Sequence, residues 1–222
     1  MSSFILVHSP LVGPVTWTWV AEELRRGGNR VVVPSLKHAA VSGSWEGCVD
    51  AAVRDAGGEI GLLVGHSGAG PLLPAIANRM DQPPRRLVFV DAAVPPVSGA
   101  APLVPEEFLD SVRALAKNGR LPRWSEWFGP RALEALVPDP DRRAAVLADL
   151  PELPLSYFHG RVPMPREWAS IAGAYVLLSD PYRSDAAEAA SRGWPVKELP
   201  GAHLDIVTRP SDLSETLLEL AV

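Results

Sequence analysis

A serine stands among small residues where an apolar run of the sequence ends. The segment 62–70 reads LLVGHSGAG, which places Ser67 after a strand pattern and immediately before a helix pattern. This arrangement predicts a sharp turn that strains the serine backbone and projects its hydroxyl from the sheet edge. Backbone N–H groups at the helix start, with Gly68 first among them, can stabilise a negative oxygen. Ser67 is therefore a candidate nucleophile for covalent catalysis.

The motif around Ser67 departs from the usual G-x-S-x-G pattern of such a turn. Ala69 occupies the fifth position, and Gly70 follows it. The alternative interpretation is a glycine-rich turn with an incidental serine. A nucleophilic role needs a histidine and an acid in the matching chain order.

The candidate histidine is His203, near the C-terminus. It follows a short strand pattern at 196–199 and precedes a helix pattern at 211–220. Parallel strands bring their carboxyl ends to one sheet edge, so His203 and Ser67 can meet despite their separation in sequence. His203 would then act as the general base that takes the serine proton.

Three aspartates could hold the imidazole of His203. Asp180 ends the strand pattern 174–179 and gives the chain order Ser, Asp, His, so it ranks first. Asp91 also ends a strand pattern, at 86–91, and ranks second; its alternative role is a structural carboxylate. Asp185 ranks third because it resembles the N-cap of a helix.

Apolar strand patterns alternate with helix patterns along the chain, which favours a parallel sheet with helices on both faces. We therefore expect an α/β fold with a mostly parallel six-stranded sheet. The expected strands are 4–8, 30–34, 61–65, 86–91, 174–179 and 196–199, and the expected helices are 16–26, 45–56, 70–80, 185–192 and 211–220.

The segment 94–171 interrupts this alternation and is rich in proline. We interpret it as a small helical cap inserted into a single domain, 1–222, with helices at 106–117, 131–136 and 141–150. Loops in this position commonly form the substrate pocket. Most of its aromatic residues are expected to pack inside the cap, while one or two line an apolar pocket; they are Trp124, Trp127, Phe128, Tyr157, Phe158 and Trp168.

The chain resembles the α/β-hydrolase superfamily, and most closely its small branch of plant methyl-ester esterases and hydroxynitrile lyases. The resemblance covers nearly the whole chain outside the middle. It is carried by the segments 4–8 (FILVH), 31–34 (VVVP), 62–70, 87–91 (LVFVD) and 201–210, and by Gly13 and Trp17. The resemblance implies a serine hydrolase on the α/β-hydrolase fold.

One departure from this branch concerns the stabilisation of a negative oxygen. The branch has His-Gly followed by a residue whose N–H helps to hold that oxygen, whereas this chain reads His8-Ser9-Pro10-Leu11. Pro10 has no N–H to donate, and losing one such donor typically slows catalysis by ~100- to 1000-fold. We expect the Leu11 N–H to replace it beside the Gly68 N–H, with the Ser9 hydroxyl as the alternative.

The bulk properties exclude several other classes of protein. The 222 residues carry a formal net charge of −5 with scattered basic residues, which argues against a nucleic-acid partner. No apolar run approaches ~18 residues, and Met1-Ser2-Ser3 does not resemble a signal peptide, so we expect no membrane association. A single cysteine, Cys48, favours a reducing, cytoplasmic compartment. No motif indicates a metal or another cofactor.

These observations predict a serine hydrolase that cleaves an ester, lactone or thioester of a small apolar molecule through an acyl-enzyme. Ser67 would attack, His203 would act as base, and Asp180 would orient the imidazole. Two alternatives remain open. One is a lyase or cyclase that uses the same pocket without an acyl-enzyme, and the other is a binding protein without catalytic activity.

Overall fold

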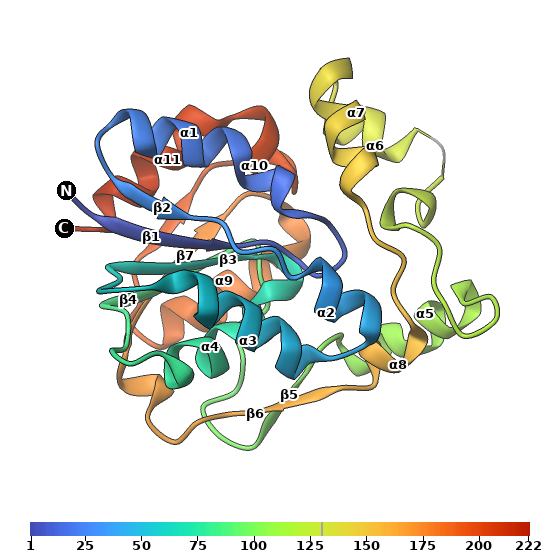
Figure 1. Ribbon diagram of the computed structural model, residues 1–222, viewed down its shortest axis with the longest axis horizontal. Coiled ribbons are helices and arrows are strands. Elements are labelled where there is room, and N and C mark those ends of the chain that lie inside the picture. The colour runs from blue at the N-terminus through green and yellow to red at the C-terminus, as the bar shows by residue number, and fades with distance from the viewer. Residues whose placement is uncertain (130) are drawn as a thin grey trace.

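Six parallel strands form the centre of the computed structural model, which describes residues 1–129 and 131–222 (Figure 1). Their order across the sheet is β2-β1-β3-β4-β7-β8. Each one overlaps a strand expected from the sequence, which confirms the expected α/β fold. The strands are β1 (Ser3–Val7), β2 (Arg30–Val32), β3 (Leu62–His66), β4 (Arg86–Val90), β7 (Ala172–Leu177) and β8 (Val196–Glu198).

Helices cover both faces of this sheet, and strand β1 shows how. Phe4 and Leu6 pack with α1 (Thr18–Arg26) and α11 (Pro210–Glu219) on one face. Ile5 and Val7 pack on the other face with α3 (Trp45–Ala56), α4 (Leu73–Arg79) and α9 (Arg183–Ser191). A strand covered on both sides is apolar at consecutive positions rather than at alternate ones. Burying each such side chain contributes roughly 1.5–3 kcal/mol.

The chain enters helix α4 through a tight turn. We expected one helix over 70–80, but the structure has a 3₁₀ helix, η2 (Ser67–Leu72), followed by α4. Pro71 and Pro74 explain the difference, because neither can donate a backbone hydrogen bond to a preceding carbonyl. Proline is tolerated only in the first turn of a helix, so the regular helix begins late.

The segment 94–171 connects β4 to β7, and its α-helices lie beyond the carboxyl ends of the strands, on the side away from the two termini (Figure 1). It holds α5 (Leu109–Leu115), α6 (Ala132–Leu136), α7 (Pro140–Asp149) and α8 (Leu155–Phe158). The sequence did not indicate α8, nor the antiparallel pair of β5 (Ala100–Pro102) and β6 (Arg161–Pro163). It also missed α2 (Lys37–Ser42) and α10 (Asp205–Thr208), which are equally short.

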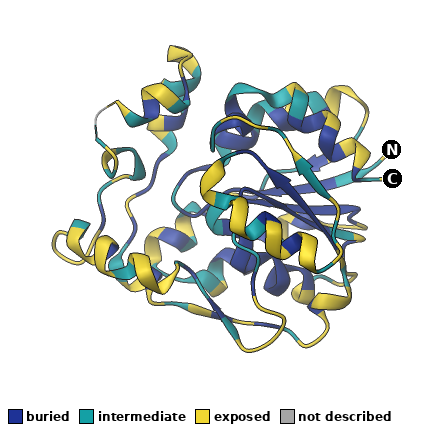
Figure 2. Ribbon diagram, turned by 180° about the vertical axis from the view of Figure 1, so that it is seen from behind, coloured by how far each residue is buried: buried dark blue, intermediate teal, exposed yellow. Residues whose placement is uncertain are grey.

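Burial follows this layered arrangement. The central strands β1, β3, β4 and β7 are buried, whereas the helices expose their outer surfaces and the cap exposes much of its length (Figure 2). No helix in the described ranges is long and apolar enough to cross a membrane. Those ranges also contain no group of three His, Cys, Asp or Glu side chains that could hold a metal ion.

Candidate active site

Ser67 follows β3 directly and has a left-handed backbone, with φ of 57°. This conformation is strained for a residue with a side chain, and it is the one expected at a nucleophile turn. The turn also needs glycine, because a Cβ at position 70 would lie only 2.3 Å from the carbonyl oxygen of Ala93. The small residues around Ser67 therefore allow the backbones to approach closely.

His203 lies against Ser67, as the sequence predicted. Its Nε2 is 3.0 Å from Ser67 Oγ. The loop that carries it is fixed between β8 and α10, because the Gly201 N–H donates to Leu178 O at 2.8 Å. The Asp205 carboxylate accepts from the Ala202 N–H at 3.0 Å and would collide with any Cβ at position 201.

The acid beside His203 is Asp91, at the end of β4. Its Oδ2 is 3.1 Å from His203 Nδ1, and the residue is fully buried. Asp91 Oδ1 accepts from the N–H groups of Leu178 and Ser179 at 2.6 and 3.1 Å, and the Ser179 hydroxyl donates to Oδ2. Three donors from the end of β7 thus hold the carboxylate toward the histidine.

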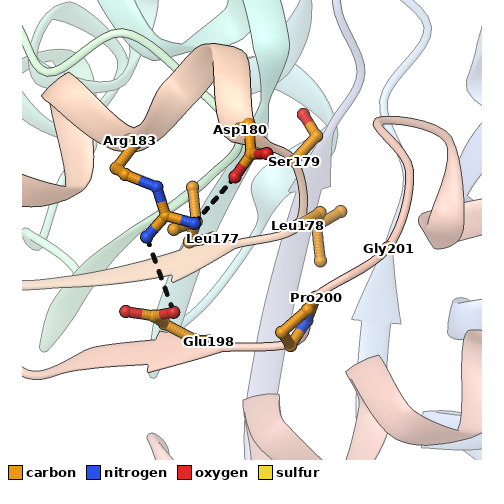
Figure 3. Close-up of a pocket in the computed structure, with 8 residues that line it drawn as sticks. All are labelled: Leu177, Leu178, Ser179, Asp180, Arg183, Glu198, Pro200 and Gly201. Carbon is orange, nitrogen blue, oxygen red and sulfur yellow. Dashed lines mark hydrogen bonds and ion pairs between the residues drawn. The ribbon is translucent and has the colours of Figure 1, made fainter.

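Asp180, which the sequence ranked first, is not placed at His203. It begins a 3₁₀ turn, η6 (Asp180–Tyr182), that directs its side chain outward. The carboxylate pairs with Arg183 at 2.7 Å and is 88% exposed. In Figure 3, Arg183 lies between Asp180 and Glu198 along one side of a small surface pocket. Asp185, the third candidate, lies inside α9 rather than at its N-cap, and accepts from the Val94 N–H.

The hydrogen bonds to Asp91 indicate where the protons of the Ser67–His203–Asp91 chain lie. Burial by itself would raise the pKa of Asp91, but the hydrogen bonds from His203, Ser179 and Leu178 outweigh it and lower that pKa. The carboxylate therefore stays ionised near neutral pH and accepts from His203 Nδ1–H. Nε2 then carries no proton and can accept the proton of Ser67.

Two aromatic rings flank the His203 imidazole, and the sequence did not indicate either. The Tyr182 ring is stacked on it, with centroids 4.9 Å apart and planes 6° apart. The His66 ring lies 4.5 Å away, and His66 Nε2–H donates to the His203 carbonyl at 2.9 Å. Burial lowers the pKa of His66 to about 3, so this histidine is neutral.

Gly68, the residue after Ser67, faces the loop after β1. Gly68 lies in the first turn of η2, where N–H groups have no partner within the helix. A Cβ at Gly68 would lie 2.9 Å from Ser9 Oγ, so Ser9 is its direct neighbour. The Leu11 N–H, our expected second donor, instead donates to Ser9 Oγ at 3.3 Å. The alternative donor, the Ser9 hydroxyl, is thus the group next to Gly68.

His8, which precedes this loop, has a structural role. Its Nε2 accepts from the Leu36 N–H at 2.9 Å, and its Nδ1–H donates to Ser9 O at 2.8 Å. Complete burial lowers the pKa of His8 to about 4, which keeps the ring neutral. These bonds fix the loop that positions Ser9.

One cap aromatic comes close to His203. The Trp124 ring lies 6.5 Å from the His203 ring, centroid to centroid. Tyr157, Phe158 and Trp168 are buried and pack within the protein, as expected for most of the cap aromatics. Among the cap aromatics named above, Trp124 therefore lies nearest to the imidazole beside Ser67.

The sequence model of the alpha/beta hydrolase family matches residues 4–216. The chain belongs to the alpha/beta hydrolase family. The resemblance seen in the sequence is thereby confirmed, and the parallel sheet with its strand–serine–helix turn is the architecture of this family.

Three relatives show how this family member compares with known proteins. A carbendazim-hydrolysing esterase of Nocardioides sp. (strain SG-4G) is 26% identical, over 99% of this chain and 100% of its own length. An extracellular α/β-hydrolase from a Paenibacillus species superposes with a TM-score of 0.77 at 21% identity, covering 99% of this chain and 98% of its own. Tomato methylketone synthase I superposes with a TM-score of 0.75 at 17% identity, covering 99% and 97%.

Proposed function

We propose that this protein is a serine ester hydrolase that works through an acyl-enzyme. The observation that carries the proposal is the continuous hydrogen-bonded chain from Ser67 through His203 to Asp91, with distances of 3.0 and 3.1 Å. The donor and acceptor roles match those of a catalytic triad, in which the acid fixes the imidazole tautomer that accepts the serine proton.

In the first step, Ser67 Oγ attacks the carbonyl carbon while its proton moves to His203 Nε2. The imidazolium that forms is stabilised by the buried Asp91 carboxylate. His203 then protonates the leaving group, and the carbonyl re-forms as an acyl-enzyme. Water releases the acyl group in the second half of the cycle, with His203 again as the base.

The negative oxygen of the intermediate needs donors on the side of Ser67 that faces Gly68. The Gly68 N–H supplies one. Pro10 has no N–H, so we assign the second donation to the Ser9 hydroxyl, which accepts from the Leu11 N–H and so keeps its own hydrogen for the substrate. Leu11 would then act through Ser9 rather than directly.

The substrate in this proposal is an ester, lactone or thioester of a small, fairly apolar molecule. The half-buried Trp124 beside His203 offers an apolar contact for such a molecule. The Nocardioides relative, named as a carbendazim-hydrolysing esterase, supports ester-type chemistry on a small molecule.

Labelling with a fluorophosphonate tests this proposal, because the reagent reacts covalently with an activated serine. We expect wild-type protein to be labelled and to hydrolyse p-nitrophenyl butyrate, and Ser67→Ala to lose both properties. Wild-type protein that is neither labelled nor active would favour a binding protein without catalysis.

A second candidate is a lyase or cyclase that uses His203 as the base without an acyl-enzyme. The presence of Pro10 favours this candidate. Proline has no N–H to donate, and acyl transfer needs donors that stabilise the negative oxygen. The two candidates differ in their need for Ser67. Acyl transfer requires both side chains, whereas base catalysis would fail in His203→Ala and retain activity in Ser67→Ala.

A further inference from the structure

Tyr182 places a hydroxyl at the nucleophile. It ends the 3₁₀ turn η6, and its Oη lies 3.4 Å from Ser67 Oγ. Its ring is stacked on the His203 imidazole, with planes 6° apart. Ser67 Oγ is therefore approached by two groups, the His203 Nε2 and the Tyr182 hydroxyl, which come from adjacent, parallel rings.

The direction of the contact follows from the triad. Asp91 accepts a hydrogen bond from His203 Nδ1–H, so Nε2 accepts from the Ser67 hydroxyl and the serine hydrogen is committed to that bond. Ser67 Oγ can then only accept from Tyr182. Burial raises the pKa of Tyr182 to about 12, so the phenol keeps its hydrogen at neutral pH and can serve as a donor.

Tyr182 approaches Ser67 from a different neighbour than the two proposed donors to the negative oxygen do. Gly68 and Ser9 lie together, whereas Tyr182 lies against His203. His203 must deliver its proton to the leaving atom, so that atom has to lie close to Nε2. The Tyr182 hydroxyl, 3.4 Å from Ser67 Oγ and carried by a ring stacked on this imidazole, is in position to reach the same atom.

We propose that Tyr182 is a catalytic residue that donates a hydrogen bond to the leaving-group oxygen; this inference rests on the ester hydrolase function proposed above. As Ser67 Oγ bonds to the carbonyl carbon, its proton passes to His203 Nε2. The bond from the carbon to the leaving oxygen then breaks, and its electron pair stays on that oxygen. His203 returns the proton to it, while Tyr182 only hydrogen-bonds to the developing charge and keeps its own proton.

The inference predicts a dependence on the leaving group. Tyr182→Phe retains the ring stacked on His203 and removes only the hydroxyl. We compare kcat/KM for ethyl butyrate, whose leaving oxygen develops a localised charge, with that for p-nitrophenyl butyrate, whose charge is delocalised. We expect Tyr182→Phe to lose about 10- to 100-fold with the ethyl ester, the range for a hydrogen bond to a charged group, and less than about 3-fold with the p-nitrophenyl ester.

Tyr157→Phe is the matched control, because Tyr157 is also a buried tyrosine and its hydroxyl has no partner among the described residues. It should leave both kcat/KM values unchanged. Unchanged thermal unfolding of Tyr182→Phe would show that the fold is retained.

The outcomes separate this inference from the function on which it rests. A greater loss with the ethyl ester supports a leaving-group role for Tyr182. An equal loss of kcat/KM with both esters, or no loss, would overturn the inference. Hydrolysis of these esters by the wild-type protein would still support the proposed esterase function. Wild-type protein that cleaves neither ester would overturn both.

Discussion

The carboxylate of Asp91 lies 3.1 Å from His203 Nδ1, although Asp91 follows β4, the neighbour of the strand that precedes Ser67, rather than β7, which precedes Asp180. Leu178 and Ser179, which directly follow the neighbouring strand β7, donate three hydrogen bonds to Asp91. Asp91 also has a left-handed backbone, with φ of 40°. Two strained residues, Ser67 and Asp91, thus contact opposite nitrogens of one imidazole, and such strain is typical of functional sites.

The first prediction concerns which acid matters for activity. Asp91→Asn should lower kcat for p-nitrophenyl butyrate by about 10⁴-fold, because the amide favours the wrong tautomer of His203. Asp180→Asn is the control, since it removes only a solvent-exposed ion pair and should leave kcat nearly unchanged. A severe defect in Asp180→Asn with a mild one in Asp91→Asn would restore the ranking drawn from the sequence.

Both aspartates follow a strand and precede His203, so the sequence could not separate them. What decides between them is the 3₁₀ turn at Asp180, which turns its carboxylate into solvent, and this depends on tertiary packing. Ser67 and His203 were identifiable because small residues and a strand pattern mark their turns. Tyr182 and His66 carry no such signal, since only the folded chain brings them to His203.

The same contrast applies to the fold. Apolar runs predicted β1, β3, β4 and β7, because a strand buried on both faces has a strong pattern. The sequence also predicted β2 and β8, which are shorter and partly exposed. The strands β5 and β6 were missed because each has only three residues and includes a proline. Pro71 and Pro74 also move the start of helix α4 to a later residue than expected, and an apolar pattern does not indicate this shift.

The second prediction concerns stability in acid. The pKa of Asp91 is lowered in the folded protein from an ordinary value of 3.8, so the ionised carboxylate stabilises the fold above that value. This contribution should be lost as the pH falls through the lowered pKa. Urea unfolding between pH 7 and pH 2 measures it, and Asp91→Asn should show a weaker loss of stability in acid. Identical pH profiles for the two proteins would contradict the assignment.

The third prediction concerns the oxyanion. Ser9→Ala should lower kcat by about 100- to 1000-fold with little change in KM, because a donor to the transition state is removed. Pro10→Ala should change turnover only modestly, since the Ser9 hydroxyl already supplies the donor. An unaffected Ser9→Ala together with strongly raised hydrolysis in Pro10→Ala would show that the native site lacks its second donor, and would favour the lyase or cyclase.

The fourth prediction concerns the pocket. Trp124→Ala should raise KM for esters with long apolar acyl chains, because the cap aromatic nearest His203 is removed. Phe108→Ala, which truncates an aromatic residue that is 55% exposed in the cap, should leave KM unchanged. Equal KM values for Trp124→Ala and wild type across a series of acyl chain lengths would show that Trp124 does not contact the acyl chain.

The central claim, an acyl-enzyme on Ser67, is tested most directly by mass spectrometry of protein quenched rapidly with acid during turnover of p-nitrophenyl butyrate. The account predicts that the intact protein gains the mass of one butyryl group, that the peptide carrying Ser67 holds it, and that Ser67→Ala shows no gain. A butyryl group found on another residue, or active wild-type protein from which Ser67→Ala does not differ in rate, would contradict it.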